Sequence, residues 1–446
     1  MKLFADLHLH SRFSRATSKN LTLQNLEKYA RIKGINLLGT GDFTHPKWLD
    51  ELKEHLAEDK TGILKTKTGF PFVLQTEVSN IFSQDNRLRK VHTVILAKNF
   101  EVVSQINEKL SKKGNLNADG RPIFGKYSCI ELVEDMKKID KDIELILAHA
   151  WTPWFSVFGS MSGFDSLQEC FREKAKHIHA IETGLSSDPP MNWRISGLDG
   201  ITLVSNSDSH SYWPWRIGRE CNILDIDLTY DSIVSAIRTK KGFIGTVEVD
   251  PNYGKYHFDG HRNCNVSLHP QETRKLNSRC PNCKNNLTIG VLNRVEELAD
   301  RAEGFVPSNS LKFHSLLPLH ELISLVYGTA ESSKKSWEIY WKLIKKFGSE
   351  MNVLLEADQD SLKSADEKLV GTIMKNRAGE IKVIPGYDGE YGRPVLDGIS
   401  RKLKKENTEI KENIEIIKEK PTKAGNIAKI KKTDKIPQKG LKEYFN

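Results

Sequence analysis

The first residues that could do chemistry are two histidines near the start of the chain, within Asp-Leu-His-Leu-His-Ser at residues 6–11. Apolar residues at every second position from Leu3 to Leu9 predict a β-strand. Residues two apart in a strand point to the same face, so we expect His8 and His10 to lie side by side. Two imidazoles on one face can bind one metal ion. Such a pair also occurs by chance, so whether it forms a metal site depends on what the later strands carry.

Imidazole and carboxylate groups recur at the ends of the later apolar segments. Each could be structural when taken singly, but the joint pattern predicts that they converge, because the chemistry of (β/α) barrels lies at the carboxyl ends of the strands. This mixture of ligands suits a multinuclear site for Zn²⁺, Mn²⁺ or Mg²⁺, which activates water and holds phosphoryl oxygens. The candidate catalytic and metal-binding residues are His8, His10, Asp42, Glu77, His92, His149, Asp208 and His210.

Short apolar strands and amphipathic helices must position these groups, and their alternation predicts a parallel α/β fold. Expected strands cover residues 35–39, 72–75, 91–97, 144–148 and 201–205, and a short apolar segment at 180–181 leads to Glu182. Expected helices cover residues 21–33, 48–57 and 230–238.

Length and composition limit the class of protein. A chain of 446 residues can bury a large core and form more than one domain. No apolar run is long enough to span a membrane, and the chain enters its first strand without a signal peptide, so we expect an intracellular, cytoplasmic and nucleoid-associated protein. Its six cysteines therefore do not imply disulfides. The net charge of +9 suits a polyanionic partner without proving one.

Basic and aromatic residues follow the candidate ligands in the same loops. Solvated charge and core packing are the simpler explanations, but this position favours contacts with phosphates and stacking on bases. Ser186, in the loop after Glu182, could contact the edge of a base. The expected DNA-binding residues are Arg12, Arg15, Lys19, Trp151, Trp154, Ser186 and Arg216.

A cysteine cluster predicts a second metal site. A histidine–cysteine pair is followed, after fifteen residues, by a Cys-x-x-Cys pair. Two such pairs close a tetrahedral Zn²⁺ site of the zinc-ribbon type, which has no open position and is therefore structural. The expected ligands are His261, Cys264, Cys280 and Cys283. His257 and His269 remain alternatives to His261.

The rest of the chain is expected to be helical and then unstructured. Helical patterns cover residues 287–301, 316–327 and 334–347, and residues 379–393 suggest a short strand with tight turns. Lysines on the third helix suit a solvated face and DNA contact equally. The expected units are a catalytic domain at 1–250, a zinc ribbon at 251–294, a helical DNA-binding domain at 295–395 and a flexible tail at 396–446.

The tail is rich in lysine, glutamate, asparagine and isoleucine, so we expect no compact core in it. Its last residues, 438–445, match the clamp-binding box of DNA repair proteins, Gln-x-x-aliphatic-x-x-aromatic-aromatic. One helical turn would present Leu441, Tyr444 and Phe445 as an apolar plug, with Gln438 as a polar contact. The expected partner is the sliding clamp PCNA.

The ordered motifs around the candidate ligands resemble those of the PHP (polymerase and histidinol phosphatase) superfamily. The matching elements are Asp-Leu-His-Leu-His-Ser at 6–11, Glu77, His92, His149 and Ser-Asp-Ser-His at 207–210. This resemblance implies a distorted seven-stranded (β/α) barrel with a trinuclear metal centre. Phe43 stands where the superfamily often has histidine, so Asp42, or less readily His45, must serve as the ligand. Arg15 stands where an acidic residue is common. The site therefore holds one ion weakly, or holds two.

The arrangement of the whole chain resembles one family more closely. A PHP barrel followed by the ribbon, by Gly-Val-Leu-Asn-Arg-Val-Glu-Glu-Leu-Ala-Asp-Arg at 290–301 and by Pro-Gly-Tyr-Asp-Gly-Glu-Tyr-Gly at 385–392 is similar to the endonuclease Q family of archaea and some bacteria. The likeness covers about residues 1–395 and includes residues 10–19.

The family resemblance implies an activity. A monomer would act on double- or single-stranded DNA and nick it 5′ of deaminated bases (uracil, hypoxanthine, xanthine) and of abasic sites by metal-activated hydrolysis, with the base flipped into a pocket. The alternatives are a PHP-type phosphatase acting on a small phosphate ester and a non-catalytic clamp-binding adaptor. A phosphatase would have little use for a ribbon and a clamp box, and the near-complete ligand set argues against the adaptor.

Overall fold

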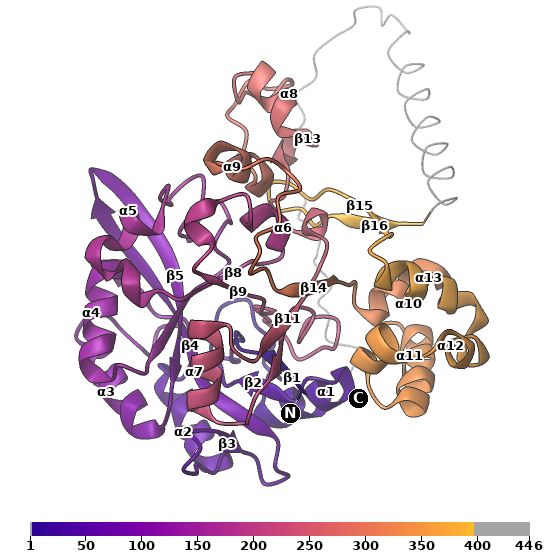
Figure 1. The fold of residues 1–446 in the computed structure, drawn as a ribbon, viewed down its shortest axis with the longest axis horizontal. Helices are drawn as coiled ribbons and strands as arrows, with labels where there is room; N and C mark the ends of the chain where they lie inside the picture. Colours follow the sequence, from indigo (N-terminus) through magenta and orange to yellow (C-terminus); the bar gives the residue numbers. More distant parts are fainter. Residues whose placement is uncertain (1, 397–446) are drawn as a thin grey trace, which may run out of the picture. The chain divides into compact units, whose positions relative to one another are not determined.

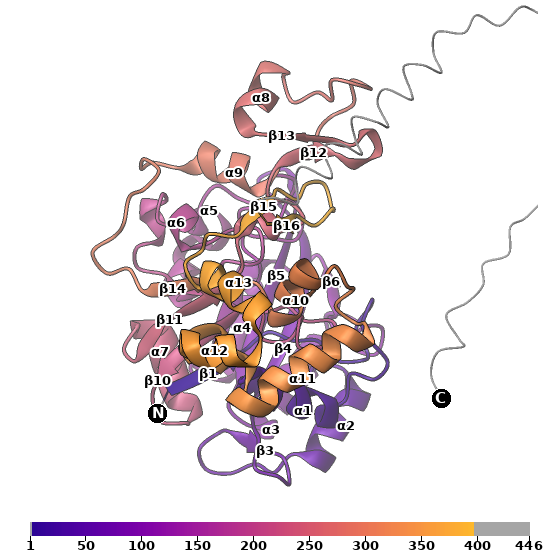
Figure 2. The same cartoon turned by 90° about the vertical axis from the view of Figure 1, so that its right-hand side faces the viewer.

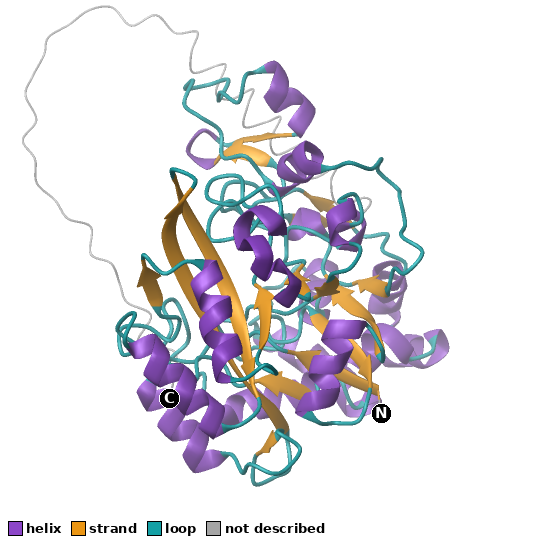
Figure 3. Ribbon diagram, turned by 60° about the vertical axis from the view of Figure 1, so that its left-hand side comes forward, coloured by secondary structure: helices purple, strands orange, loops and turns teal. Residues whose placement is uncertain are grey.

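The computed structural model describes residues 2–396, and the expected clamp-binding box at 438–445 lies outside them. A curled, twelve-stranded mixed sheet forms its centre (Figures 1 and 3). Seven of its strands pair in the order β1 (Lys2–Asp6), β2 (Leu37–Gly39), β4 (Pro71–Gln84), β5 (Arg87–Ala97), β7 (Glu144–Leu147), β8 (Ala180–Glu182) and β9 (Thr202–Val204).

The curl of these seven strands brings the end of β9 back to the end of β1. Leu9 and Ser209 form a β-bridge there. The side-chain amide of Asn222 lies across the same seam and donates to the carbonyls of Ala5 and Ser205, over 3.1 and 2.9 Å. Buried carbonyls require such partners. The expected distorted seven-stranded barrel is confirmed.

The expectation of a purely parallel sheet is wrong, because β5 runs antiparallel to both β4 and β7. β4 and β5 form a long hairpin that turns at Asp85 and Asn86, both with positive φ (52° and 59°). Asp and Asn tolerate that conformation, which two-residue hairpin turns require. Glu77 therefore lies inside β4 rather than at a strand end, and His92 lies in the middle of β5.

Five further strands complete the sheet. The sequence patterns indicated none of these five, which are β3 (Leu64–Lys65), β6 (Ile123–Gly125), β10 (Cys221–Asp225), β11 (Phe243–Glu248) and β14 (Lys312–Ser315). β10 pairs antiparallel to β1, and β11 and β14 continue the sheet beyond it.

Helices cover the outer face of the barrel (Figure 3). The main ones are α1 (Leu23–Lys33), α2 (Pro46–His55), α3 (Phe100–Ser111), α4 (Cys129–Ile139) and α7 (Tyr230–Thr239). α1 begins where the Thr22 side chain accepts from the Asn25 amide, and it ends at Gly34, whose φ is +96°. These are the expected start and stop signals of a helix. The predictions for α1, α2 and α7 are confirmed, whereas α3 and α4 were not predicted.

The segment with the predicted ribbon ligands and a group of helices follow the barrel (Figure 2). Their elements are β12 (Asp259–His261), β13 (Val266–Leu268), α8 (Pro270–Lys275), α9 (Val291–Leu298), α10 (Leu319–Tyr327), α11 (Lys334–Phe347), α12 (Gln359–Ala365) and α13 (Glu367–Arg377). A short hairpin, β15 (Lys382–Ile384) and β16 (Arg393–Val395), closes the described chain. Within residues 2–396, no helix has the length and apolar character needed to cross a membrane.

A buried ion pair joins the barrel to these helices. The Lys33 ammonium donates to Glu350 over 2.6 Å and to the carbonyl of Pro214 over 2.9 Å. The Tyr340 hydroxyl and the Leu319 amide donate to the same carboxylate, each over 2.9 Å. Both charged side chains are buried, and a buried charge is tolerated only when it is paired and hydrogen-bonded in this way.

Candidate metal centre

A first group of candidate ligands gathers just beyond the end of β1. Nε2 of His10 lies 3.0 Å from Oδ1 of Asp208 and 3.3 Å from Oε2 of Glu77. Nε2 of His8 lies 3.7 Å from each of these oxygens and, although buried, has no hydrogen-bond partner. The four potential ligand atoms lie within 4.8 Å of one another. An unpaired buried nitrogen facing two carboxylates fits a cation bound among them.

A second group shares Glu77 with the first. Oε1 of Glu77 lies 2.9 Å from Nδ1 of His92 and 3.3 Å from Nε2 of His149. The two imidazole nitrogens are themselves 3.3 Å apart. Oε2 of Glu77 thus faces the first group, and Oε1 faces the second. A carboxylate that bridges two cations is typical of two-metal hydrolytic sites.

Hydrogen bonds from behind orient the imidazoles. Nδ1 of His8 contacts both oxygens of Glu182, at 2.9 and 3.1 Å, and Nδ1 of His10 lies 3.0 Å from Oδ1 of Asp42. Such contacts fix the tautomer and leave Nε2 free for a metal. Glu182 was not among the predicted site residues, although its place at the end of β8 follows the same pattern as the others.

The charged groups of the centre shift one another's pKa values. Burial alone would lower the pKa of His8, but Glu182 and Glu77 outweigh it and raise that pKa well above its usual range. Burial alone would raise the pKa of Glu77, but His92, Arg121 and His8 outweigh it and hold it well below its usual range. Burial lowers the pKa of His92 to about 4, which keeps its imidazole in the neutral, metal-binding form. The ionised carboxylates favour a bound cation.

Three other candidates lie outside these two groups in the described chain. The Asp42 carboxylate faces His10 and accepts from the Ser14 hydroxyl over 2.8 Å, so it supports a ligand rather than joining the ligand groups. His45 stacks on the Phe13 ring, with the ring centroids 4.3 Å apart. Nδ1 of His210 lies 3.0 Å from the carbonyl of Asp208, and its ring lies 4.5 Å from that of His10.

A cavity of about 730 Å³ opens beside the centre. His149, Asp208 and His210 form part of its wall, as do three of the predicted DNA-binding residues, Trp154, Ser186 and Arg216. The sequence patterns did not indicate Lys255, Tyr256 and Tyr391, which also line it. The Arg216 guanidinium and the Lys255 ammonium lie over the Tyr391 ring, 5.5 and 4.6 Å from its centroid. The cavity therefore combines cations with aromatic faces.

The remaining predicted DNA-binding residues do not line the cavity. Arg12 pairs with Glu51 over 2.5 Å, Arg15 is 79% exposed and pairs with Asp119 over 3.1 Å, and Lys19 is exposed. Trp151 is buried, and its indole N–H donates to Asn192 over 2.7 Å. Its ring packs within the barrel and is not available to stack on a base, so that expectation is corrected.

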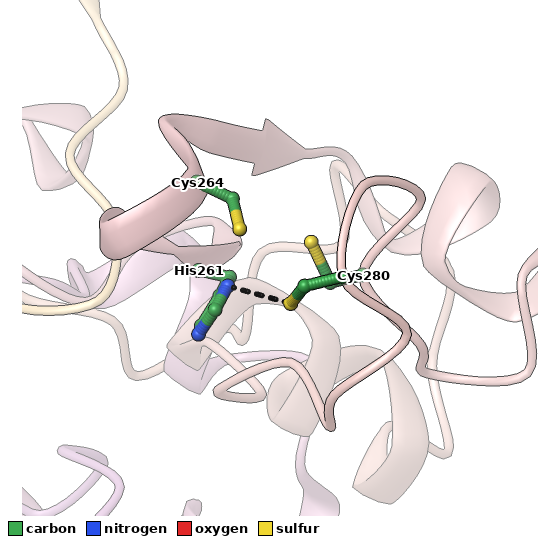
Figure 4. Close-up of side chains that lie close together, drawn as sticks. His261, Cys264 and Cys280 are labelled. Atoms are coloured by element: carbon green, nitrogen blue, oxygen red, sulfur yellow. Dashed lines mark hydrogen bonds between the residues drawn. The ribbon is translucent and has the colours of Figure 1, made fainter. Parts of the chain in front are cut away.

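The predicted ribbon ligands come together as a third group (Figure 4). The side chains of His261, Cys264 and Cys280 point toward one another in Figure 4. Together with Cys283, they place their potential ligand atoms within 4.8 Å of one another. The two alternative histidines are engaged elsewhere: Nδ1 of His257 lies 3.1 Å from the Ser186 carbonyl, and His269 caps α8. Cysteine with histidine in a closed group of four suits a structural Zn²⁺.

Comparisons with known sequences give relatives without an assigned activity. Residues 318–380, which contain α10–α13, match the family model described as the MJ0043 C-terminal domain. The chain is 36% identical over 253 residues to the uncharacterised protein MJ0043 of Methanocaldococcus jannaschii, covering 55% of this chain but only 31% of that relative. It is 29% identical over 413 residues to the uncharacterised protein YqxK of Bacillus subtilis, covering 88% of this chain and 99% of YqxK.

Two solved structures match most of the chain. One is the lesion-specific endonuclease PfuEndoQ of Pyrococcus furiosus, with 31% identity, a TM-score of 0.80, and coverage of 89% of this chain and 96% of that one. The other is endonuclease Q in complex with a 27-mer duplex substrate with an abasic lesion at the active site, with 31% identity, a TM-score of 0.81, and coverage of 89% and 97%.

The barrel and its shared-carboxylate centre define a metal-dependent enzyme of the PHP type. Identity above 30% over nearly the whole length of solved endonuclease Q chains defines the family more narrowly. The chain belongs to the endonuclease Q family of lesion-specific endonucleases.

Proposed function

We propose that the protein is a DNA repair endonuclease that hydrolyses the phosphodiester 5′ of a deaminated base or an abasic site. The observation that carries this proposal is the opening of the two ligand groups into a cavity that is lined by cationic and aromatic side chains. Family membership supports it, because one solved relative is bound to a duplex with an abasic lesion at its active site. A phosphatase for small esters would not require so large a cavity beside its centre.

Each part of the site would have a distinct task. His8, His10, Glu77 and Asp208 would hold one ion, and Glu77, His92 and His149 would hold the other. Ions such as Zn²⁺, Mn²⁺ or Mg²⁺ would supply an activated water and neutralise phosphoryl charge. Arg216 and Lys255 would contact backbone phosphates. Trp154 and Tyr256, whose rings meet edge to face at 5.9 Å, would flank an extruded base.

The test uses labelled duplexes that each contain one uracil, hypoxanthine or abasic site. We expect a single nick 5′ of the lesion, lost with a chelator and restored by added Mn²⁺ or Mg²⁺. Asp208→Ala should abolish nicking yet bind the same duplex, because the carboxylate belongs to the ligand group and the cavity remains. Denaturing electrophoresis and fluorescence anisotropy measure the two properties. Equal cutting of an undamaged duplex, or full activity in the Asp208 variant, would contradict the proposal.

The clamp partner remains a proposal from the sequence. We expect Tyr444→Ala with Phe445→Ala to lose binding to PCNA in calorimetry, because apolar anchors dominate such contacts. Lys439→Ala with Lys442→Ala is the matched control at the non-anchor positions of the same box, and it should bind as the parent does. The aromatic variant should nick naked lesion DNA at the parent's rate. Clamp binding as tight as the parent's would exclude the box.

A further inference from the structure

A cationic side chain contacts the metal centre without belonging to either ligand group. NH1 of Arg121 lies 2.8 Å from Oε2 of Glu77, the oxygen that faces His8 and His10. Glu77, and then Asp208 and Asp119, raise the pKa of the Arg121 guanidinium, so it faces the carboxylates of the centre as a permanent cation. Its side chain is 26% exposed, whereas Glu77 is fully buried. Arg121 is therefore both fixed to the centre and accessible.

The segment that carries Arg121 is held in place from both sides. Oδ1 of Asp119 accepts from the amides of Arg121 and Arg15, over 3.1 and 3.4 Å. The amide of Gly120 donates to the Phe13 carbonyl over 3.0 Å. Position 120 also requires glycine, because a Cβ there would lie 2.3 Å from both the carboxylate of Asp42 and the hydroxyl of Ser14. The loop thus packs directly against the residues that support His10.

The positions at which the PHP resemblance implies further ligands carry none in this chain. Phe43 is buried and cannot bind a metal, and Arg15 points to Asp119. Both oxygens of Asp42 are engaged by His10, Ser14 and the Ser11 amide. In the described chain, the histidine and carboxylate side chains of the barrel form two groups that could each hold one ion, and Arg121 is a further cation beside Glu77.

We propose that Arg121 is a catalytic residue whose guanidinium contacts a non-bridging oxygen of the phosphate being cut and replaces the charge of a third metal ion. This inference rests on the proposed phosphodiester hydrolysis. Water adds to phosphorus, one P–O ester bond breaks, and the departing oxygen takes the proton; Arg121 neither gives nor accepts one. The negative charge on the phosphoryl oxygens during this step is stabilised by a donor that is already oriented. The planar guanidinium suits such contacts better than an ammonium does.

Arg121→Gln removes the charge while keeping a side-chain donor. We expect kcat to fall about 10²- to 10³-fold, with the affinity for the lesion duplex and the ion content of the barrel unchanged. Arg121→Lys should lie between this variant and the parent. Arg238→Gln is the matched control, since Arg238 is 23% exposed and pairs with the fully buried Glu144 over 2.6 Å at the opposite end of the barrel strands. It should lose thermal stability but not kcat.

Ion content is measured by elemental analysis, kcat by single-turnover nicking, and folding by the melting temperature. Parent-like kcat in Arg121→Gln would overturn the proposal. Loss of one barrel ion in that variant would also overturn the proposal, because Arg121 would then act by positioning the metal ligands and not by contacting the phosphate. If Arg121→Gln does not fold, Arg121→Lys decides, and parent-like kcat there would exclude the guanidinium contact. The same comparison on bis(p-nitrophenyl) phosphate separates the two proposals: a parent that hydrolyses this diester but not lesion DNA would refute only the lesion specificity.

Discussion

Glu77→Gln is expected to abolish cleavage, with kcat/KM reduced at least about 10³-fold, because one carboxylate serves both groups of ligands. The amide oxygen cannot replace a charged bridge between two cations. Elemental analysis should show that the barrel loses its ions while the ribbon keeps its own. Single-turnover nicking of a lesion duplex measures the loss of activity.

Glu144→Gln is the matched control for this variant. Glu144 is also a fully buried carboxylate on a barrel strand, but it pairs with Arg238 and lies at the start of β7, whereas the metal centre lies beyond the strand's other end. We expect this variant to be less stable than the parent and to retain its ions and its kcat. Retention of both barrel ions by Glu77→Gln would refute the shared-carboxylate centre.

Cys280→Ser is expected to unfold the ribbon locally, because structural Zn²⁺ contributes about 10–16 kcal/mol to the folding of small zinc domains. Only three apolar or cysteine side chains form its buried cluster, Val266, Cys280 and Leu287, so little else holds it. Hydrogen exchange should increase across residues 257–290, with one ion lost per chain. His269→Ala, a variant of an alternative ligand, should keep the zinc. An unchanged zinc content in Cys280→Ser would exclude the ribbon.

Much of the barrel could be predicted from the sequence because its signals are local. Alternating apolar residues identify β1, and helix periodicity with a Thr22 cap and Gly34 terminator identifies α1. The strand-end rule selected His149 and Asp208, which the structure places in the two ligand groups. Each of these predictions depends on residues only a few positions apart.

The antiparallel hairpin was missed for a physical reason. The expected strand at 72–75 continues to Gln84, through the polar residues Glu77, Ser79 and Asn80, all of which are buried. Glu77 faces the centre and Asn80 donates to the carbonyl of Tyr127, so the apolar alternation that marks a strand is lost although the strand continues. Functional polar residues within a strand therefore interrupt the sequence pattern by which that strand would be recognised.

Contacts between distant segments could not be predicted either. Arg121 meets Glu77 across 44 positions of sequence, and Lys255 meets Tyr391 across an even longer separation. Trp151 and Trp154 are alike in type and loop, yet only Trp154 lines the cavity. The backbone turns between the two tryptophans, where the Thr152 amide donates to the His149 carbonyl over 3.2 Å, and the residue types alone do not indicate this turn.

The buried Lys33–Glu350 pair limits how the protein can be dissected. Excision of residues 318–380 would remove the carboxylate that pairs with the Lys33 ammonium, and it would uncover the face of the barrel on which that pair is buried. The same lysine holds the Pro214 carbonyl, two residues before the cavity residue Arg216. A chain cut down to the barrel would therefore lose a contact that supports the cavity-lining loop around Arg216. The helices therefore support the barrel, and an engineered truncation would need polar replacements for the apolar side chains that the helices now cover.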